Sequence, residues 1–200
     1  MVDSYNTISN SEEVEFKEKG SRFISISFPL NSDEEFKRIM KELRGKYFDA
    51  SHICYAYTLG LNHEIVRAND AGEPHHSAGD PILSQIKSFK LTNVLVVVIR
   101  YFGGTKLGVP GLISAYKKAA KEVLEKSVVI EKYQTQSIEI SFGFEQMSWV
   151  MKNIKASEAE IIDQIFDAEN IRTSLKIVGR KSLIAGLLES LQGVQGVEIS

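Results

Sequence analysis

The order of hydrophobic and polar positions predicts a sheet in the first two thirds of the chain. Residues 13–30 predict two alternating strands around a glycine, and residues 50–60 and 64–70 predict two more. Residues 93–102, NVLVVVIRYF, are too apolar for a half-exposed strand and predict a central one. We therefore expect one sheet whose central strand runs into the glycine-rich stretch at residues 100–111, RYFGGTKLGVPG.

Helical spacing separates these strands. Residues 31–48 predict a helix that Ser32 caps. Residues 79–89 predict a second helix, with Asp80 as the N-cap and Pro81 in the first helical position. The first helix has a buried stripe of Phe36, Ile39, Met40 and Leu43. A third helix of about four turns follows the glycines, marked by Leu112, Ile113, Tyr116, Ala119, Ala120, Val123 and Leu124.

The last third of the chain has the order β-α-β-β-α-β, which is the ferredoxin-like arrangement. The sequence predicts a strand in residues 136–142, a helix in 145–156, a strand pair in 159–179, a helix in 181–193 and a last strand in 194–200. This part has no histidine and no cysteine, and its acidic residues are scattered. We expect an α+β protein of two domains, residues 1–132 and 133–200.

Charge is spread unevenly along the chain. Residues 19–132 hold 17 Lys and Arg against 12 Asp and Glu, a net of +5, whereas residues 133–200 hold 6 against 9, a net of −3. With the acidic first 18 residues the whole chain carries −2. A mildly basic middle permits contact with nucleic acid, and an ordinary solvated surface explains it as well.

Cysteine usage and hydropathy predict a cytoplasmic protein. Cys54 is the one cysteine, so an internal disulfide is impossible and a reducing compartment fits. The first residues are polar and acidic, unlike a signal peptide, and no apolar run approaches the roughly 20 residues that span a membrane.

The glycine-rich stretch has three interpretations. A glycine turn that leads into a helix gathers N–H donors and suits an anion, and Arg100 and Lys106 add positive charge. The phosphate-loop pattern fails, because Val109 and Pro110 occupy its Lys and Ser/Thr positions. A nucleotide-binding enzyme is therefore disfavoured, while an RNA-phosphate or other anion site and a purely structural corner stay open.

Histidines and acids elsewhere are weak indications of chemistry. His52 and Cys54 lie on one face of a strand, where a hydrogen-bonded structural histidine and an inert buried thiol are expected. The four histidines lack the spacing of a zinc site, so we expect no metal and no cofactor. In the loop RANDAGEPHHSAGDP, Asp70 and Glu73 are candidates for an acid–base pair or for turn caps.

Four segments occur in an order that resembles the IMPACT family: GSRFIS, ASHICYAY, NDAGEPHHSAGDPIL and VVVIRYFGGTKLGVPGLISAY. The resemblance implies a first domain like domain 2 of ribosomal protein S5. It implies a second, ferredoxin-like domain similar to the carboxy-terminal domain of elongation factor G. The loop departs from the family pattern, since Ala71 replaces an acid and His75-His76-Ser77 replace Ser-Gly-Thr.

The resemblance also implies a role in translation. Eukaryotic members restrain a translation-initiation kinase, a role not carried over here because the second domain is of the bacterial kind. No enzymatic activity is firmly attached to the family.

Our hypothesis is a non-enzymatic module that binds RNA, the ribosome or a translation-associated protein, without a membrane role. The expected contact residues are Arg100, Tyr101, Gly103, Gly104, Lys106, Gly108, Asp70, Glu73, His75 and His76.

Two alternatives stay open. One is a small-molecule or phosphate-binding enzyme, such as a hydrolase, with Asp70, Glu73, His75 and Arg100 in one cleft. The other is an adaptor that binds protein only.

Overall fold

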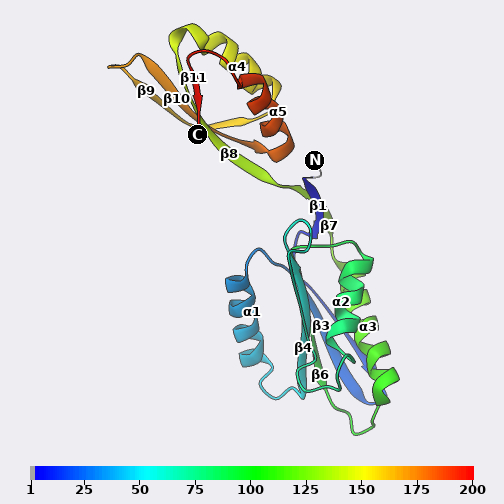
Figure 1. Cartoon of the computed structure of the whole chain (residues 1–200). Coiled ribbons are helices and arrows are strands. Elements are labelled where there is room, and N and C mark those ends of the chain that lie inside the picture. Colours follow the sequence, from blue (N-terminus) through cyan, green and yellow to red (C-terminus); the bar gives the residue numbers. More distant parts are fainter. Residues whose placement is uncertain (1–2) are drawn as a thin grey trace. The chain divides into compact units, whose positions relative to one another are not determined.

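The computed structural model describes residues 3–200 and has two compact units of mixed α and β structure (Figure 1). One unit is Tyr5–Lys132, and the other joins residues 133–200 to Asp3 and Ser4. Each unit has its own sheet and its own hydrophobic core. In the described part of the chain, no helix is long and apolar enough to cross a membrane.

The unit Tyr5–Lys132 is built on a five-stranded sheet of order β2-β3-β6-β4-β5. Neighbouring strands pair antiparallel. The strand β6 lies in the middle and is buried from Val94 to Arg100, which confirms the central strand predicted from its apolar run. The strands are β2 (Glu12–Glu18), β3 (Ser21–Pro29), β4 (His52–Leu59), β5 (Ile65–Asn69) and β6 (Val94–Tyr101).

Helices cover both faces of this sheet (Figure 1). The helix α1 (Asp33–Lys46) lies on one face, and α2 (Gly79–Ser88) and α3 (Gly108–Lys126) lie on the other. Successive side chains of a strand point to opposite faces, so β6 divides its residues between two cores. Val94, Val96 and Val98 enter the core beneath α2 and α3, and Leu95, Val97 and Ile99 enter the core beneath α1.

Helix starts and faces depart from the sequence pattern at two points. Ser32 caps α1 as predicted, since its Oγ accepts a hydrogen bond from the Glu35 N–H at 3.2 Å. Asp80 does not cap α2, because the helix begins at Gly79 with Ala78 in the N-cap position, two residues before the predicted cap. Ile113 is 39 % exposed, because α3 turns Ala115 and not Ile113 toward the sheet.

The strands β1 (Ser4–Ile8) and β7 (Val129–Tyr133) pair in a separate two-stranded sheet.

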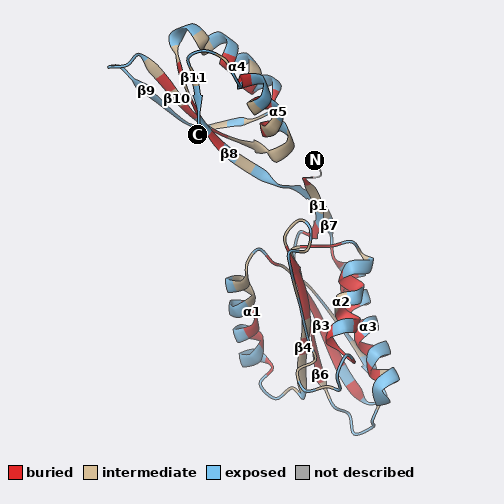
Figure 2. Cartoon of the chain, in the orientation of Figure 1, coloured by how far each residue is buried: buried red, intermediate tan, exposed pale blue. Residues whose placement is uncertain are grey.

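The second unit follows the order β-α-β-β-α-β, with a sheet of order β11-β8-β10-β9. Its helices α4 and α5 cover one face of the sheet, and the buried residues gather between them and the strands (Figure 2). Asp3 joins this unit by an ion pair with Arg180, whose Nη2 lies 2.7 Å from Oδ1. The elements are β8 (Thr135–Gly143), a short 3-10 helix η1 (Phe144–Gln146), α4 (Met147–Ala156), β9 (Glu160–Asp167), β10 (Arg172–Arg180), α5 (Lys181–Leu191) and β11 (Val197–Ile199).

Candidate functional site

The glycines between β6 and α3 shape the turn itself. A Cβ atom at Gly103 would collide with the carbonyl of Gly20, because the turn packs backbone to backbone against the β2–β3 hairpin. Gly104 has a φ of +87° and Gly108 a φ of +72°, the left-handed region that glycine adopts without strain. Close approach and backbone conformation therefore explain these three glycines without any ligand.

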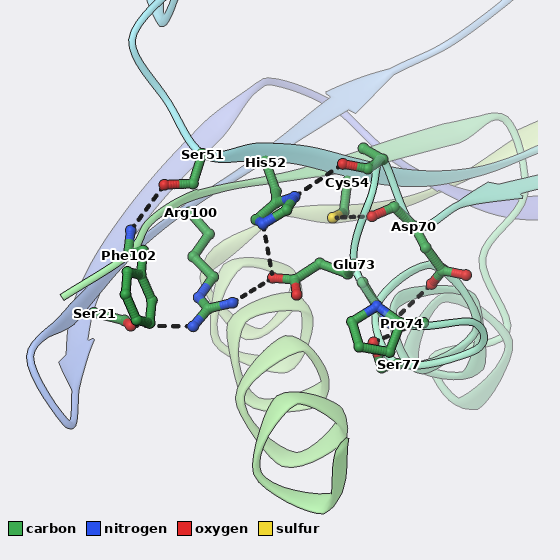
Figure 3. A network of polar contacts seen from close by, with 12 residues as sticks. Ser21, Ser51, His52, Cys54, Asp70, Glu73, Pro74, Ser77, Arg100 and Phe102 are labelled. Carbon is green, nitrogen blue, oxygen red and sulfur yellow. Dashed lines mark hydrogen bonds and ion pairs between the residues drawn. The ribbon is translucent and has the colours of Figure 1, made fainter. Parts of the chain in front are cut away.

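Arg100 does not reach solvent. Its side chain is 5 % exposed, because position 100 continues the β6 alternation onto the face beneath α2 and α3. Nη1 donates to the Glu73 carboxylate at 2.6 Å, and Nη2 donates to Ser21 Oγ at 3.3 Å (Figure 3). The buried Nε has no hydrogen-bond partner among residues 3–200. Glu73 thus neutralises Arg100 inside the fold, and the direct phosphate contact expected for Arg100 from the sequence stays a prediction.

Glu73 connects the loop to the core. Its side chain is 4 % exposed, and its Oε1 also accepts a hydrogen bond from the Tyr116 hydroxyl at 2.8 Å. His52 Nε2 lies 3.9 Å from the same oxygen (Figure 3). A carboxylate this buried needs a counter-charge, which Arg100 supplies. The Arg100–Glu73 ion pair thus holds the loop that contains Glu73 against the end of the sheet.

His52 and Cys54 complete the network and do not form a nucleophile pair. His52 Nδ1 lies 2.9 Å from the Ala71 carbonyl oxygen and holds the loop from the strand side. The Cys54 thiol donates to the Asp70 carbonyl at 3.0 Å. Burial raises the pKa of Cys54 to about 12, so the thiol stays protonated at neutral pH. Only the thiolate is strongly nucleophilic, and this cysteine is therefore inert.

A pocket of about 340 Å³ opens above this ion pair. His52, Glu73 and Arg100 contribute its polar lining. Phe102 and Val109 are 49 % and 47 % exposed. The remaining lining is Pro74, Phe102, Lys106, Leu107, Gly108, Val109 and Leu112. We call its exposed rim, made of Phe102, Lys106, Gly108 and Val109, the turn surface.

Asp70 serves as the cap that the sequence assigned to Asp80. Its Oδ1 accepts hydrogen bonds from the N–H groups of Ala78 at 2.9 Å and Gly79 at 2.8 Å, and Oδ2 accepts from the His76 N–H at 2.9 Å. Burial alone would raise the pKa of Asp70, but these three donors outweigh it and hold the pKa below its usual value. Asp70 is therefore a structural carboxylate, as the turn-cap interpretation expected.

The two loop histidines lie apart from the turn surface. His75 and His76 line a separate hollow of about 460 Å³ with Asp70 and Asp80. His76 Nδ1 lies 2.6 Å from Asp80 Oδ2, and both side chains are exposed. Glu73 lines this hollow as well as the pocket above Arg100. Within residues 3–200, no group of His, Cys, Asp and Glu has the arrangement of a metal site.

The predicted contact residues thus separate into several places. Arg100, Glu73, Lys106 and Gly108 line one pocket, whereas Asp70, His75 and His76 line the neighbouring hollow. Tyr101 points to the opposite face of the sheet, where its hydroxyl donates to Asp49 at 2.9 Å. Gly103 and Gly104 form the turn itself.

Sequence reasoning missed Phe102 as an exposed aromatic residue and Tyr116 as a partner of Glu73. Phe102 follows the strand directly, where the alternation of the strand no longer predicts its exposure. Tyr116 lies on the buried stripe of its helix and carries no signal of a polar role.

The model of the Impact N-terminal domain matches residues 19–124. The IMPACT family member YvyE of Bacillus subtilis (strain 168) is 33 % identical over 171 residues, which cover 86 % of this chain and 78 % of the relative. The IMPACT family member YigZ of Escherichia coli (strain K12) is 27 % identical over 152 residues, or 75 % of this chain and 74 % of the relative.

A eukaryotic relative and a solved structure are also similar. Protein IMPACT of Oryctolagus cuniculus is 29 % identical over 150 residues, which cover 72 % of this chain and 45 % of that protein. A solved structure described as the crystal structure of an hypothetical protein matches with a TM-score of 0.73 and 23 % identity. The match covers 100 % of the present chain and 97 % of the solved chain, so the two proteins share a fold.

Proposed function

The chain belongs to the IMPACT family, and from this membership we propose that it is a non-enzymatic, translation-associated module that binds RNA, the ribosome or a ribosome-associated protein. The turn surface is the contact region. This assignment depends on an exposed aromatic ring, Phe102, and an exposed cation, Lys106, on the turn between β6 and α3. Aromatic and cationic side chains on a fixed backbone recur in sites that bind nucleic acids and proteins.

The proposed folds of the two units agree with this role. The order β-α-β-β-α-β with sheet order β11-β8-β10-β9 supports a ferredoxin-like fold for residues 133–200, like the carboxy-terminal domain of elongation factor G. For residues 5–132 we propose the fold of ribosomal protein S5 domain 2, as the family resemblance implies. Both of these relatives work on the ribosome.

Arg100 acts in this scheme as a positioning residue. The Arg100–Glu73 ion pair fixes the loop and the start of the turn, and Phe102 N–H donates to Ser51 Oγ at 3.0 Å. Lys106 and Phe102 make the contacts. A preformed surface of this kind loses little conformational entropy on binding.

Co-sedimentation with ribosomes at low and at physiological salt tests the assignment. We expect the wild type to travel with ribosomal particles. Phe102→Ala and Lys106→Glu should each weaken the affinity about 5- to 150-fold and so reduce the bound fraction, since a central aromatic or charged contact contributes roughly 1–3 kcal/mol. Lys87→Glu is the matched control, because Lys87 is an exposed lysine in the last turn of α2.

Three results separate the possible partners. If Phe102→Ala and Lys106→Glu bind like Lys87→Glu, the turn surface is not the contact. If nuclease treatment leaves the complex intact, the partner is a protein, as in the adaptor alternative. If the wild type does not sediment with ribosomes at either salt concentration, the ribosome is excluded.

The enzyme alternative has less geometric support. It needs Asp70, Glu73, His75 and Arg100 in one cleft, whereas the Asp70 carboxylate caps α2 and the Glu73 carboxylate is paired with Arg100. A thermal-shift screen of nucleotides, sugar phosphates and divalent metals tests it. A ligand at 100-fold its Kd should add about 2.7 kcal/mol of stability.

A further inference from the structure

The helix α1 carries a stripe of three cations on one side, of which the first, Lys37, pairs with Asp33 one turn before it. Lys37, Lys41 and Arg44 follow one another at i, i+4 and i+7, so they lie on one side of the helix, and all three are exposed. Like charges at this spacing cost a few tenths of a kcal/mol each. For Lys41 and Arg44 no ion pair is found among residues 3–200.

The other side of α1 is arranged differently. There Arg38 pairs with Glu35 at 3.7 Å and with Glu42 at 3.1 Å. On the side of the stripe, Asp33 and Glu34 in the first turn oppose Lys37, whereas the later positions, Lys41 and Arg44, carry charges of one sign.

The cationic stripe borders a groove with an aromatic floor. Lys37, Lys41 and Arg44 line a hollow of about 330 Å³. The ring centroids of Phe36 and Tyr55 lie 5.0 Å apart, so the two rings form a continuous apolar surface. The full lining is Phe36, Lys37, Met40, Lys41, Arg44 and Tyr55, which we call the α1 groove.

Arg67 adds a fourth positive charge from the sheet. It lies directly across from Tyr57 in the β4–β5 pairing, so it shares the α1 face with Tyr55. Burial raises the pKa of Tyr55, and the charges of Arg44 and Arg67 oppose that rise.

One acid faces the groove, and it is already engaged. Asp33 accepts a hydrogen bond from the Tyr57 hydroxyl at 2.7 Å and pairs with Lys37 at 3.0 Å. Within the part of the chain that the structure describes, no carboxylate lies at ion-pair distance from Lys41, Arg44 or Arg67.

We propose that the α1 groove binds single-stranded RNA, with Lys41, Arg44 and Arg67 on the phosphates and the rings of Tyr55 and Phe36 against a base. Clustered cations alone would suit any acidic surface. The aromatic floor favours a chain of bases, because base–aromatic stacking contributes about 1–3 kcal/mol per base, whatever its sequence. This groove lies across the sheet from the turn surface, so it is a second site and does not depend on the first.

The test is the affinity of the full chain for fluorescently labelled oligouridylate and oligoadenylate RNA, measured by anisotropy over a series of salt concentrations. We expect both RNAs to bind, with an affinity that falls steeply as salt rises. Lys41→Gln/Arg44→Gln should weaken binding at least about tenfold and reduce the salt slope by roughly 1.4, since each lost phosphate contact removes about 0.7 from the slope.

Two further variants make the result specific. Tyr55→Leu keeps an apolar side chain in the groove and should weaken binding without changing the salt slope. Lys117→Gln/Lys121→Gln removes the same two charges from α3, on the other face of the sheet, and should leave affinity close to that of the wild type.

Several outcomes would overturn this assignment. One is a wild type that binds neither RNA at low salt, and another is an equal loss in the α1 and α3 double variants, which would indicate attraction by net charge only. A groove variant that binds RNA normally but loses a protein partner would point to an acidic protein surface instead. Loss at the α1 groove is read from the affinity for the oligonucleotides and loss at the turn surface from co-sedimentation with ribosomes, so failure at the two sites is distinguishable.

Discussion

At the scale of single residues, the Arg100–Glu73 ion pair is the most consequential contact of the candidate site. Both side chains are at most 5 % exposed, and the pair also engages Ser21 and Tyr116. A buried pair is weak evidence for stability in itself, but removal of one partner leaves a charge without compensation.

Glu73→Gln is therefore expected to destabilise the unit Tyr5–Lys132 by about 3–5 kcal/mol, because the Arg100 guanidinium stays buried without a counter-charge. Urea unfolding measures the change in the free energy of unfolding, and hydrogen exchange of the β6 amides gives an independent measurement of it. The double variant Glu73→Gln/Arg100→Met should recover part of the loss, since it removes the stranded charge. A single variant within about 1 kcal/mol of the wild type would contradict the assignment of this contact.

Cys54 makes a prediction about alkaline pH. Its pKa is raised from 9.0 to about 12 by burial, so the folded state keeps the thiol proton longer than the unfolded state does. The resulting stabilisation is complete below pH 9 and is lost as the pH rises toward 12.

We expect the melting temperature of the wild type to fall more steeply than that of Cys54→Ala between pH 9 and 11. The Cys54 thiol should also react with a thiol reagent at pH 8 only after the protein is unfolded. Rapid labelling of the folded protein would show that the thiol is accessible and ionised, against this account.

At the scale of elements, the N-terminus of α2 is capped by a carboxylate from the preceding loop. A cap is usually sought next to the helix, and Asp80 lies in the right place in the sequence. The structure uses Asp70 instead, because the loop folds back and brings its carboxylate to the N–H groups of Ala78 and Gly79.

Asp70→Ala should cost about 1–2 kcal/mol, the usual range for a lost N-cap, whereas Asp80→Ala should change stability by less than about 0.5 kcal/mol. Because the pKa of Asp70 is lowered, its contribution is present above the ordinary value of 3.8 and is lost as the pH falls further. Thermal unfolding of the two variants at pH 7 and pH 3 measures both effects. If the two variants lost equal stability at pH 7, Asp70 would not be the preferred cap of α2.

The turn between β6 and α3 also takes its form from a distant element. Gly103 has to be glycine because the β2–β3 hairpin packs against it at Gly20. The sequence showed glycines that suit a ligand as well as a corner. Only the position of the β2–β3 hairpin shows that Gly103 is needed for the turn itself.

At the scale of the whole molecule, each unit has its own core and its own ionic contacts. Asp3 is fully buried and accepts hydrogen bonds from Arg180 Nε and from the Ser182 N–H, both at 2.8 Å. These donors hold the pKa of Asp3 well below its usual range. A residue from the start of the chain therefore stabilises the unit formed by its last third.

Asp3→Asn should lower the melting temperature of the unit that holds residues 133–200, read from the fluorescence of Trp149, the one tryptophan in the chain. The gap between variant and wild type should narrow as the pH falls below 3.8, because the carboxylate then gains a proton in the unfolded state while the folded state still holds it ionised. Asp163→Asn, an exposed carboxylate on β9, is the control. A loss of the same size in that control would show that Asp3 has no special role.

Much of the fold follows from the sequence by itself, because periodicity reports local geometry. The apolar run of residues 94–99 determined a central strand, and Ser32 followed by acids determined the start of α1. The alternation of side chains along β4 put His52 and Cys54 on one face. Four segments in order along the chain, among them the motif around residues 100–111, indicated the family.

The candidate site depended on contacts between residues far apart in the chain. Arg100 meets Glu73 across 27 positions, and Tyr116 meets it across 43. Periodicity carries no information about such pairs, so an arginine at a strand end could point to solvent or inward. The tertiary structure turns the Arg100 side chain inward, because the loop places the buried Glu73 carboxylate there and this carboxylate requires a positive partner. It also brought Lys41 and Arg44 beside Tyr55 in one groove, with Arg67 on the same face of the sheet opposite Tyr57, a grouping that no stretch of the sequence contains.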